Sequence, residues 1–198
     1  MLLYNSQVSG NCYKVRLLLA HLGLSYDRLE VDVVDRSDRP QLLGNLNPAL
    51  RVPTLVLDDG RAIGESGAIL HYFAEGTEYW PTDRYERAQV LQWMFFEQYD
   101  LEPNIAVARF LLLYTGVEPD PEVIAARQAG GRKTLAALEA HLARNEFLVG
   151  GRYSIADIAV YGYTHVADGA GLELANYPAV QAWIARVAAQ PGHVTLFD

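Results

Sequence analysis

A proline at the start of an apolar run is the sequence feature that most restricts the fold of this chain. Pro53 directly precedes residues 54–57, which alone would be predicted as a β-strand. Proline has no N–H for a sheet ladder, so Pro53 must be the first residue of the strand or lie in a cis turn. A cis bond would leave the N–H and C=O of Val52 pointing outward, free to pair with an extended peptide. A turn at 58–60 and a short strand at 61–63 then complete a predicted hairpin.

A predicted helix follows the hairpin and begins at Glu65 and Ser66. Ile69, Leu70 and Phe73 lie on one face of it. The first N–H groups of a helix are unpaired and carry partial positive charge, so this end suits a carboxylate ligand. The alternative is that Ser66 is only the N-cap of the helix. Together, the hairpin and the helix could bind the backbone and the end group of a small peptide.

Residues 1–76 are predicted to form an α/β unit. A strand at 2–4, a helix at 12–22, a strand at 26–34 and a short helix at 37–44 precede the hairpin and its helix. This β-α-β-α-β-β-α order is typical of a thioredoxin-like domain. The chain has no CxxC motif, so the redox form of that domain is not predicted.

Residues 84–198 are predicted to form an all-helical domain. Before this domain, Gly76 and Pro81 interrupt the apolar periodicity of strands and that of helices. A long helix is expected at 85–99, with Pro103 breaking or kinking it before a helix at 105–114. Another helix is expected at 121–142, with a weak point at Gly130–Gly131. Ser154 and Asp157 have the spacing of a capping box, which makes Asp157 a structural residue despite its carboxylate.

This order of elements, with Val52–Pro53 and Glu65–Ser66 at their positions, resembles the cytosolic glutathione transferases. The resemblance covers nearly the whole chain and implies that fold, an α/β thioredoxin-like N-terminal domain followed by an all-α C-terminal domain. It also implies glutathione as co-substrate. The residues that it assigns to glutathione binding are Ser9, Arg51, Val52, Pro53, Glu65 and Ser66.

The first loop is predicted to carry the chemistry. A transferase must hold the glutathione sulfur as a thiolate, and a helix N-terminus with a donor hydroxyl lowers a thiol pKa. In serine-type transferases the activating serine lies five residues after the Leu-Tyr of the first strand, as Ser9 lies five after Tyr4. Asn11 resembles the asparagine of a nu-like bacterial class, which precedes a Lys-Ile pair as Asn11 precedes Lys14-Val15. Ser9 and Asn11 are the predicted catalytic residues.

Two alternatives remain for this loop. Ser9 could be only an N-cap and Asn11 only a turn residue. Cys12 could form mixed disulfides with glutathione, as in beta- and omega-like classes, although small thiols are often buried.

The resemblance places the acceptor-substrate pocket near the Ser9 loop and the long helices. Its predicted residues are Tyr99, Asn104, Arg109 and Tyr114, and Arg109 could instead be a solvated helix arginine. Conjugation, glutathione-dependent disulfide or peroxide reduction, and a zeta-like isomerisation are the competing reactions. A non-catalytic interaction module is the alternative outside enzymes, and an adaptor would need no sulfur site.

Composition and charge limit the kinds of partner that we expect for this protein. The formal net charge is −8 and Lys14 and Lys133 are the only lysines, so neither nucleic acid nor an anionic membrane is an expected partner. One cysteine, no recognisable signal peptide and no apolar run of about 18 residues indicate a soluble cytoplasmic protein. The histidines show no metal-ligand spacing, so no metal site is predicted. Apolar residues on several faces of the helix at 85–99 predict a homodimer.

Overall fold

The computed structural model describes all 198 residues, and their contacts divide the chain into two units. The first unit comprises Met1–Thr77 and Pro191–Asp198, and the second comprises Glu78–Gln190. The sequence assigned the last eight residues to the helical domain. They pack with the first unit instead, because the side chains of Tyr13 and Arg16 donate to the carbonyls of Val194 and Leu196.

A four-stranded mixed sheet forms the first unit, in the order β2-β1-β3-β4. Its strands are β1 (Leu2–Asn5), β2 (Asp27–Glu30), β3 (Thr54–Val56) and β4 (Ala62–Gly64). β1 runs parallel to β2 and antiparallel to β3, which forms the predicted hairpin with β4. β2 ends four residues earlier than predicted, since the Asp32 carboxylate accepts from the N–H groups of Val34 and Asp35 and makes a turn there.

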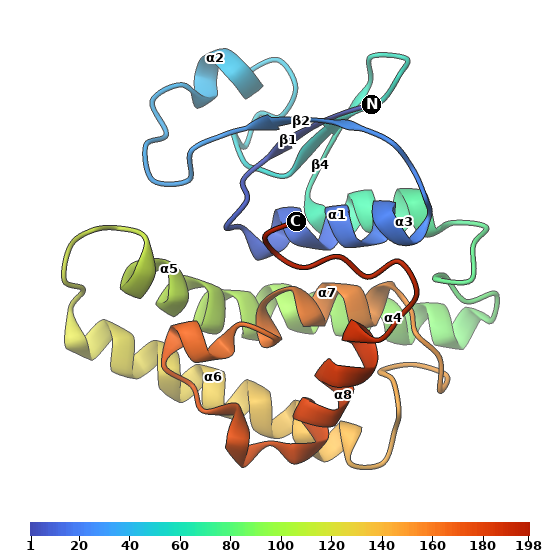
Figure 1. Ribbon diagram of the computed structural model, residues 1–198, viewed down its shortest axis with the longest axis vertical. Coiled ribbons are helices and arrows are strands. Elements are labelled where there is room, and N and C mark those ends of the chain that lie inside the picture. Colours follow the sequence, from blue (N-terminus) through green and yellow to red (C-terminus); the bar gives the residue numbers. More distant parts are fainter. The chain divides into compact units, whose positions relative to one another are not determined.

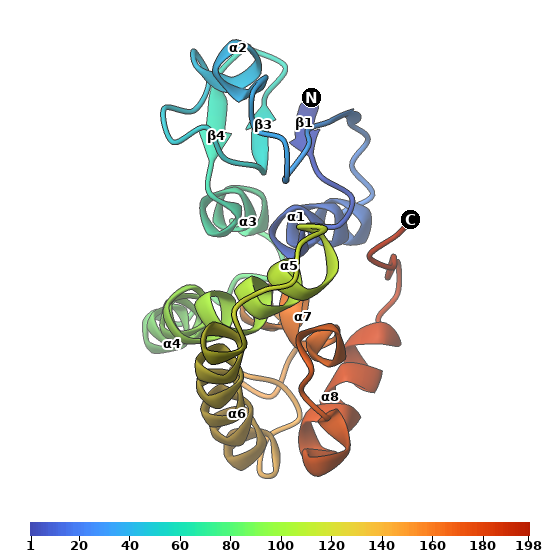
Figure 2. The same cartoon turned by 90° about the vertical axis from the view of Figure 1, so that its left-hand side faces the viewer.

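Helices cover both faces of this sheet. α1 (Gly10–His21) and α3 (Ser66–Ala74) lie on one face, and the short α2 (Arg39–Leu43) lies on the other (Figures 1 and 2). The core between the sheet and the helices α1 and α3 contains Leu3, Val15, Leu19, Leu55 and Ile69. This packing fixes the N-termini of α1 and α3 on one scaffold.

The second unit is helical throughout. Its elements are α4 (Arg84–Phe96), the π-helix η1 (Glu97–Ala106), α5 (Val107–Leu113), α6 (Pro121–Leu142), α7 (Ile155–Thr164), the 3-10 helices η2 (Ala167–Ala170) and η3 (Leu174–Asn176), and α8 (Pro178–Ala188). Every residue of α7 is buried, and α7 packs against α4, η1 and α8. None of the helices combines the length with the apolar character that crossing a membrane requires.

Pro103 was predicted to break or kink the helix, and of these two outcomes the break is wrong. Pro103 lies inside η1, which joins α4 to α5 without an intervening loop. A π-helical segment tolerates the proline because its widened turn no longer needs every α-helical N–H donor. The side chains of Asn104 and Thr134 donate to the Asp100 carbonyl at 2.6 and 3.2 Å, which satisfies one acceptor in the irregular turn.

Gly130 and Gly131 are close-packing positions and do not interrupt α6. A Cβ atom at Gly130 would lie 2.2 Å from Asn104 Oδ1, and one at Gly131 would lie 2.6 Å from Leu172 Cδ1. A larger residue at either position would have to displace the neighbouring side chain, that of Asn104 in η1 or that of Leu172 after η2.

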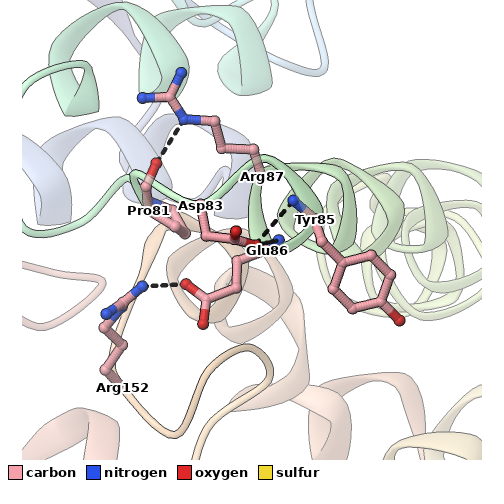
Figure 3. Close-up of polar contacts among 6 residues, drawn as sticks. All are labelled: Pro81, Asp83, Tyr85, Glu86, Arg87 and Arg152. Atoms are coloured by element: carbon pink, nitrogen blue, oxygen red, sulfur yellow. Dashed lines mark hydrogen bonds and ion pairs between the residues drawn. The ribbon is translucent and has the colours of Figure 1, made fainter.

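Polar contacts fix the start of α4 (Figure 3). The Asp83 carboxylate accepts from the N–H groups of Tyr85 and Glu86 at 2.9 and 3.0 Å, the arrangement of an N-cap. Glu86 also pairs with Arg152, and Arg87 Nε donates to the Pro81 carbonyl at 2.6 Å. The Tyr85 side chain points away from these contacts and is 71% exposed.

The predicted capping box at the start of α7 is confirmed. Asp157 Oδ2 accepts from the N–H of Ser154 at 3.0 Å, and the Ser154 hydroxyl caps the helix. Asp157 Oδ1 accepts from the N–H of Leu148 and from Trp183 Nε1. Asp157 is completely buried, and this burial raises its pKa to about 6 against the lowering effect of its hydrogen bonds. These contacts account for the carboxylate without a catalytic role.

Candidate functional site

The Val52–Pro53 peptide bond is cis, one of the two geometries that the sequence predicted. Asn47 braces this turn, since its Nδ2 donates to the Arg51 carbonyl and to Thr54 Oγ1 at 3.2 and 3.0 Å. The Asn47 amide lies over Gly64, where a Cβ atom would approach its Nδ2 to 2.8 Å. No hydrogen bond within the chain involves the N–H or C=O of Val52. The backbone of Val52 is thus held in place and unpaired, while the Arg51 side chain is exposed.

Glu65 and Ser66 lie at the same end of the hairpin, because Thr54 of β3 pairs with Gly64 of β4. Glu65 has φ of 64° and ψ of 120°, in the left-handed half of conformational space that non-glycine residues rarely adopt. Such backbone strain costs about 1–3 kcal/mol and is concentrated at ligand sites. Glu65, rather than Ser66, is the N-cap of α3, and its side chain makes no capping hydrogen bond. The alternative that Ser66 is only an N-cap is therefore wrong.

Ser9 is the N-cap of α1. Its Oγ accepts from the N–H of Cys12 at 3.3 Å, as the capping alternative predicted. A hydroxyl has two acceptor positions and one donor proton, so this bond leaves the proton of Ser9 available. The hydroxyl is also hydrogen-bonded to the Cys12 thiol, a weak acceptor whose pKa this contact lowers. The capping bond does not use the hydroxyl proton, so capping α1 is compatible with donation to a ligand sulfur, for which the protonated Cys12 thiol is the competing acceptor.

Asn11 connects the beginnings of the two helices. It is the second residue of α1, and its Oδ1 lies 2.7 Å from Lys14 Nζ and 3.5 Å from Ser66 Oγ. The structure thus brings together Ser9 and Asn11 from the first loop and Ser66 from the start of α3. Partial positive charge from both helix N-termini is directed at this place.

The loop at 6–9 is supported by Arg16, which the sequence analysis missed. Arg16 is 2% exposed, and its guanidinium donates to Asn5 Oδ1 at 2.8 Å and to the Gln7 carbonyl at 3.3 Å. Burial lowers the pKa of Arg16 below its ordinary value. Lys14 is also buried, at 1% exposure. The sequence feature that could have indicated their burial is that both basic residues lie among the apolar positions of one short helix.

Cys12 has the wrong surroundings for a nucleophile. Its side chain is completely buried, and Sγ accepts from the N–H of Ser6 at 3.3 Å. Burial raises the pKa of the Cys12 thiol to about 11, although the hydrogen bonds lower it. The thiolate is the reactive form of cysteine, so this thiol is protonated and inaccessible at neutral pH. The structure therefore argues against the cysteine-type mechanism.

Each of the two units contains a region that matches a known protein family. Residues 3–78 match the model described as glutathione S-transferase, N-terminal domain, and residues 121–186 match glutathione S-transferase, C-terminal domain. The disulfide-bond oxidoreductase YfcG of Escherichia coli is 31% identical over 189 residues, which are 91% of this chain and 87% of that protein. The chain belongs to the glutathione S-transferase family. The predicted fold, a thioredoxin-like domain followed by a helical domain, is thereby confirmed.

Two solved structures extend this glutathione S-transferase comparison. The crystal structure of a glutathione S-transferase from Pseudomonas fluorescens is 46% identical, with a TM-score of 0.96, and the match covers 100% of this chain and 98% of that one. The glutathione transferase URE2P8 of Phanerochaete chrysosporium, crystallised with oxidized glutathione, is 25% identical, with a TM-score of 0.86 over 96% and 90% of the two chains.

The four residues predicted for the acceptor pocket of this family member have different surroundings within the helical unit. Arg109 is 5% exposed, so its interpretation as a solvated arginine is wrong. Its guanidinium donates to the Tyr114 hydroxyl at 2.6 Å, which brings these two residues together. Asn104 packs against Gly130 and donates to a main-chain carbonyl, while Tyr99 is 83% exposed. Asn104 thus has a structural role within the unit, and Tyr99 presents its ring to solvent.

Proposed function

We propose that the first unit binds glutathione and that the thiolate of the bound tripeptide attacks a disulfide or an electrophilic small molecule. The observation that carries this proposal is the joining of the two helix N-termini, in which Asn11 of α1 is hydrogen-bonded to Ser66 of α3. Ser9 precedes α1 with a hydroxyl proton that its capping bond does not use, and the unpaired backbone of Val52 lies at the hairpin end that leads to Glu65.

Each part of the cluster suits one part of glutathione. The N–H and C=O of Val52 would pair with the backbone of the cysteinyl residue, as an added strand pairs with a sheet edge. Glu65, Ser66 and the first N–H groups of α3 would hold the γ-glutamyl end, where an ammonium meets the Glu65 carboxylate and a carboxylate meets the helix N-terminus. The exposed Arg51 side chain offers one more cationic contact.

The sulfur would lie at the start of α1. There the Ser9 hydroxyl donates to the thiolate, and the helix N-terminus adds partial positive charge. Both effects favour the ionised thiol and lower its pKa towards neutrality. Because donors fixed by the fold need no reorganisation during the reaction, they stabilise the thiolate more effectively than water does.

Disulfide reduction is the reaction that we favour among those open to a thiolate. The glutathione thiolate attacks one sulfur of the substrate disulfide, forms a mixed disulfide and releases the other sulfur as a thiolate, which takes up a proton. A second glutathione thiolate then releases the reduced substrate and yields oxidised glutathione. Two observations support this choice: the position of Asn11, and the similarity to a relative named a disulfide-bond oxidoreductase.

Titration calorimetry with reduced and oxidised glutathione tests the binding site. Ser66→Ala should weaken binding by about 1–3 kcal/mol, because a hydrogen bond to a charged group is lost. Ser9→Ala should lower turnover of a mixed-disulfide substrate by roughly ten- to a thousandfold while leaving binding largely intact. Ser25→Ala is the matched control, since Ser25 is exposed and lies outside the cluster. Absence of any glutathione binding to the unmodified protein would refute the proposal.

A further inference from the structure

Lys14 occupies a position where lysine is rarely found. It lies in the second turn of α1 and is 1% exposed, and the chain has only one other lysine. A lysine is almost never fully buried unless its ammonium group is paired. The Nζ atom of Lys14 lies 2.7 Å from Asn11 Oδ1, within the cluster described above.

The contact with Lys14 determines which end of the Asn11 amide, the oxygen or the NH2, faces Lys14. An ammonium group has three donors and no acceptor, so the amide group must turn its oxygen, and not its NH2, toward Lys14. Ser66 Oγ approaches the same oxygen at 3.5 Å, so a second donor favours the same orientation. The Asn11 NH2 group faces away from both donors. No atom of the chain accepts from it, and the Asn11 side chain is partly exposed.

We propose that Lys14 is a positioning residue that holds Asn11 with its amide NH2 directed at the sulfur of the bound thiol. This inference rests on the proposed function, because it needs glutathione in the site. An amide that turned over would present its oxygen, an acceptor, to a thiolate and would disfavour the ionised sulfur. Lys14 thus makes Asn11 a donor without itself touching the substrate.

A double-mutant cycle between Lys14 and Asn11 tests this. Lys14→Met removes the ammonium and keeps an unbranched apolar side chain. It should lower kcat/KM roughly ten- to a hundredfold, as expected when a reacting group is misplaced. It should also raise the pH at which bound glutathione ionises, read from the ultraviolet absorption of its thiolate. In the Asn11→Ala background the same change should have little further effect, because residues that act through one another are not additive. Additive losses would show that Lys14 acts independently of Asn11 and would overturn the inference.

A second variant tests the amide orientation without touching the buried lysine. Asn11→Asp keeps an oxygen acceptor for Lys14 but has no N–H to donate, so it should stay folded and lose thiolate formation to the same extent as Asn11→Ala. Lys14→Arg supplies donors alone and should recover most of the activity lost in Lys14→Met. An Asn11→Asp protein with wild-type activity would overturn the inference, since the oxygen of Asn11 would then suffice.

These outcomes separate the two proposals. If the unmodified protein binds glutathione and Ser9→Ala lowers turnover, the proposed function stands whatever the Lys14 variants do. If, in addition, Lys14→Met and Asn11→Asp ionise bound glutathione like the unmodified protein, only the positioning role is lost. If the unmodified protein does not bind glutathione, both proposals fail.

Discussion

At the scale of single residues, Ser9 and Cys12 lie three positions apart and have opposite chemical surroundings. The Ser9 hydroxyl is partly exposed at the start of α1, and its capping bond does not use its proton. The Cys12 thiol is enclosed by the core of the first unit, where burial raises its pKa to about 11. The same helix therefore presents a donor to a ligand and withdraws a potential nucleophile from it.

We predict that Cys12→Ala leaves glutathione-dependent turnover largely unchanged. The protein should lose roughly 1 kcal/mol of unfolding free energy, because the substitution removes one buried atom from a packed site. In the unmodified protein, an alkylating reagent should modify Cys12 slowly in buffer and rapidly in denaturant, which mass spectrometry follows directly. The opposite result, loss of turnover in Cys12→Ala together with a glutathione adduct on Cys12 of the unmodified protein, would establish the cysteine-type mechanism.

Sequence patterns were sufficient to nominate Ser9, Asn11 and Ser66, but they did not predict that Lys14 and Arg16 are buried. The reason is that α1 contacts more than the sheet. Arg16 donates to the carbonyl of Leu196, which is 180 residues away in the chain. A local periodicity shows one apolar face of a helix, and it cannot show that a distant segment covers another face.

At the scale of elements, α7 depends on a carboxylate that has no exposure to water. Asp157 accepts hydrogen bonds from the N–H groups of Leu148 and Ser154 and from the indole of Trp183, so it ties the start of α7 to α8. Its raised pKa means that the ionised form is less favourable in the folded chain than in the unfolded one. Asp157 thus stabilises the unit through its hydrogen bonds, whereas burying its negative charge is unfavourable.

This cost predicts a pH dependence of the unfolding free energy. Because the folded-state pKa of Asp157 is raised from 3.8 to about 6, the folded chain binds this proton more tightly than the unfolded chain does. The stabilisation from the proton is present below the unfolded pKa and is lost as pH rises through the folded pKa. The unfolding free energy of the unmodified protein, relative to that of Asp157→Asn, should therefore fall by about 3 kcal/mol from about pH 3 to about pH 7.

Urea unfolding of the two proteins across this range measures the difference. Asp157→Asn cannot titrate at this position, so its lost acceptor contributes a constant offset and all of the pH dependence comes from Asp157 itself. A difference that stays constant, or that grows with rising pH, would contradict a buried carboxylate whose pKa is raised.

The helical unit also shows where local sequence patterns fail at the element scale. The capping box of α7 was predictable because both of its partners lie within four residues of each other. The π-helix at Pro103 was not predictable. The Asp100 carbonyl in that turn is satisfied partly by Thr134 of α6, and Gly130 allows the close approach of Asn104. When only its own helix is considered, a proline predicts a break. Here the neighbouring helix α6 supplies a hydrogen bond from Thr134 and space at Gly130, neither of which can be seen in the local sequence.

At the scale of the whole molecule, a stripe of exposed apolar side chains remains on the second unit. Leu91, Phe95 and Tyr99 recur every four residues along α4 and the start of η1. Phe95 is 68% exposed and Tyr99 is 83% exposed, whereas Val90 and Met94 of the same helix are buried. Residues four apart lie on one face of a helix, so the exposed set forms a continuous surface. Such a surface is typical of an interaction site.

We predict that this stripe is the interface of a two-fold homodimer, in which the same surface of each copy meets the other. Phe95→Asp would place two charges in the interface and remove two buried rings. A buried phenylalanine contributes about 1.5–3 kcal/mol, so the dimer should weaken by about 3–6 kcal/mol, or roughly a hundred- to ten-thousandfold in its dissociation constant. Sedimentation velocity at micromolar concentration should show a species of twice 22.0 kDa for the unmodified protein and the 22.0 kDa monomer for Phe95→Asp.

Val117→Ser provides the matched control for this prediction. Val117 is 70% exposed in the same unit but lies in the segment after α5, away from the stripe. Its substitution should leave the dimer intact, because the loss of an exposed apolar side chain outside the interface does not change the buried area. A Phe95→Asp protein that still sediments as a dimer would place the interface elsewhere. An unmodified protein that sediments at 22.0 kDa would show that the stripe is not a self-association surface at all.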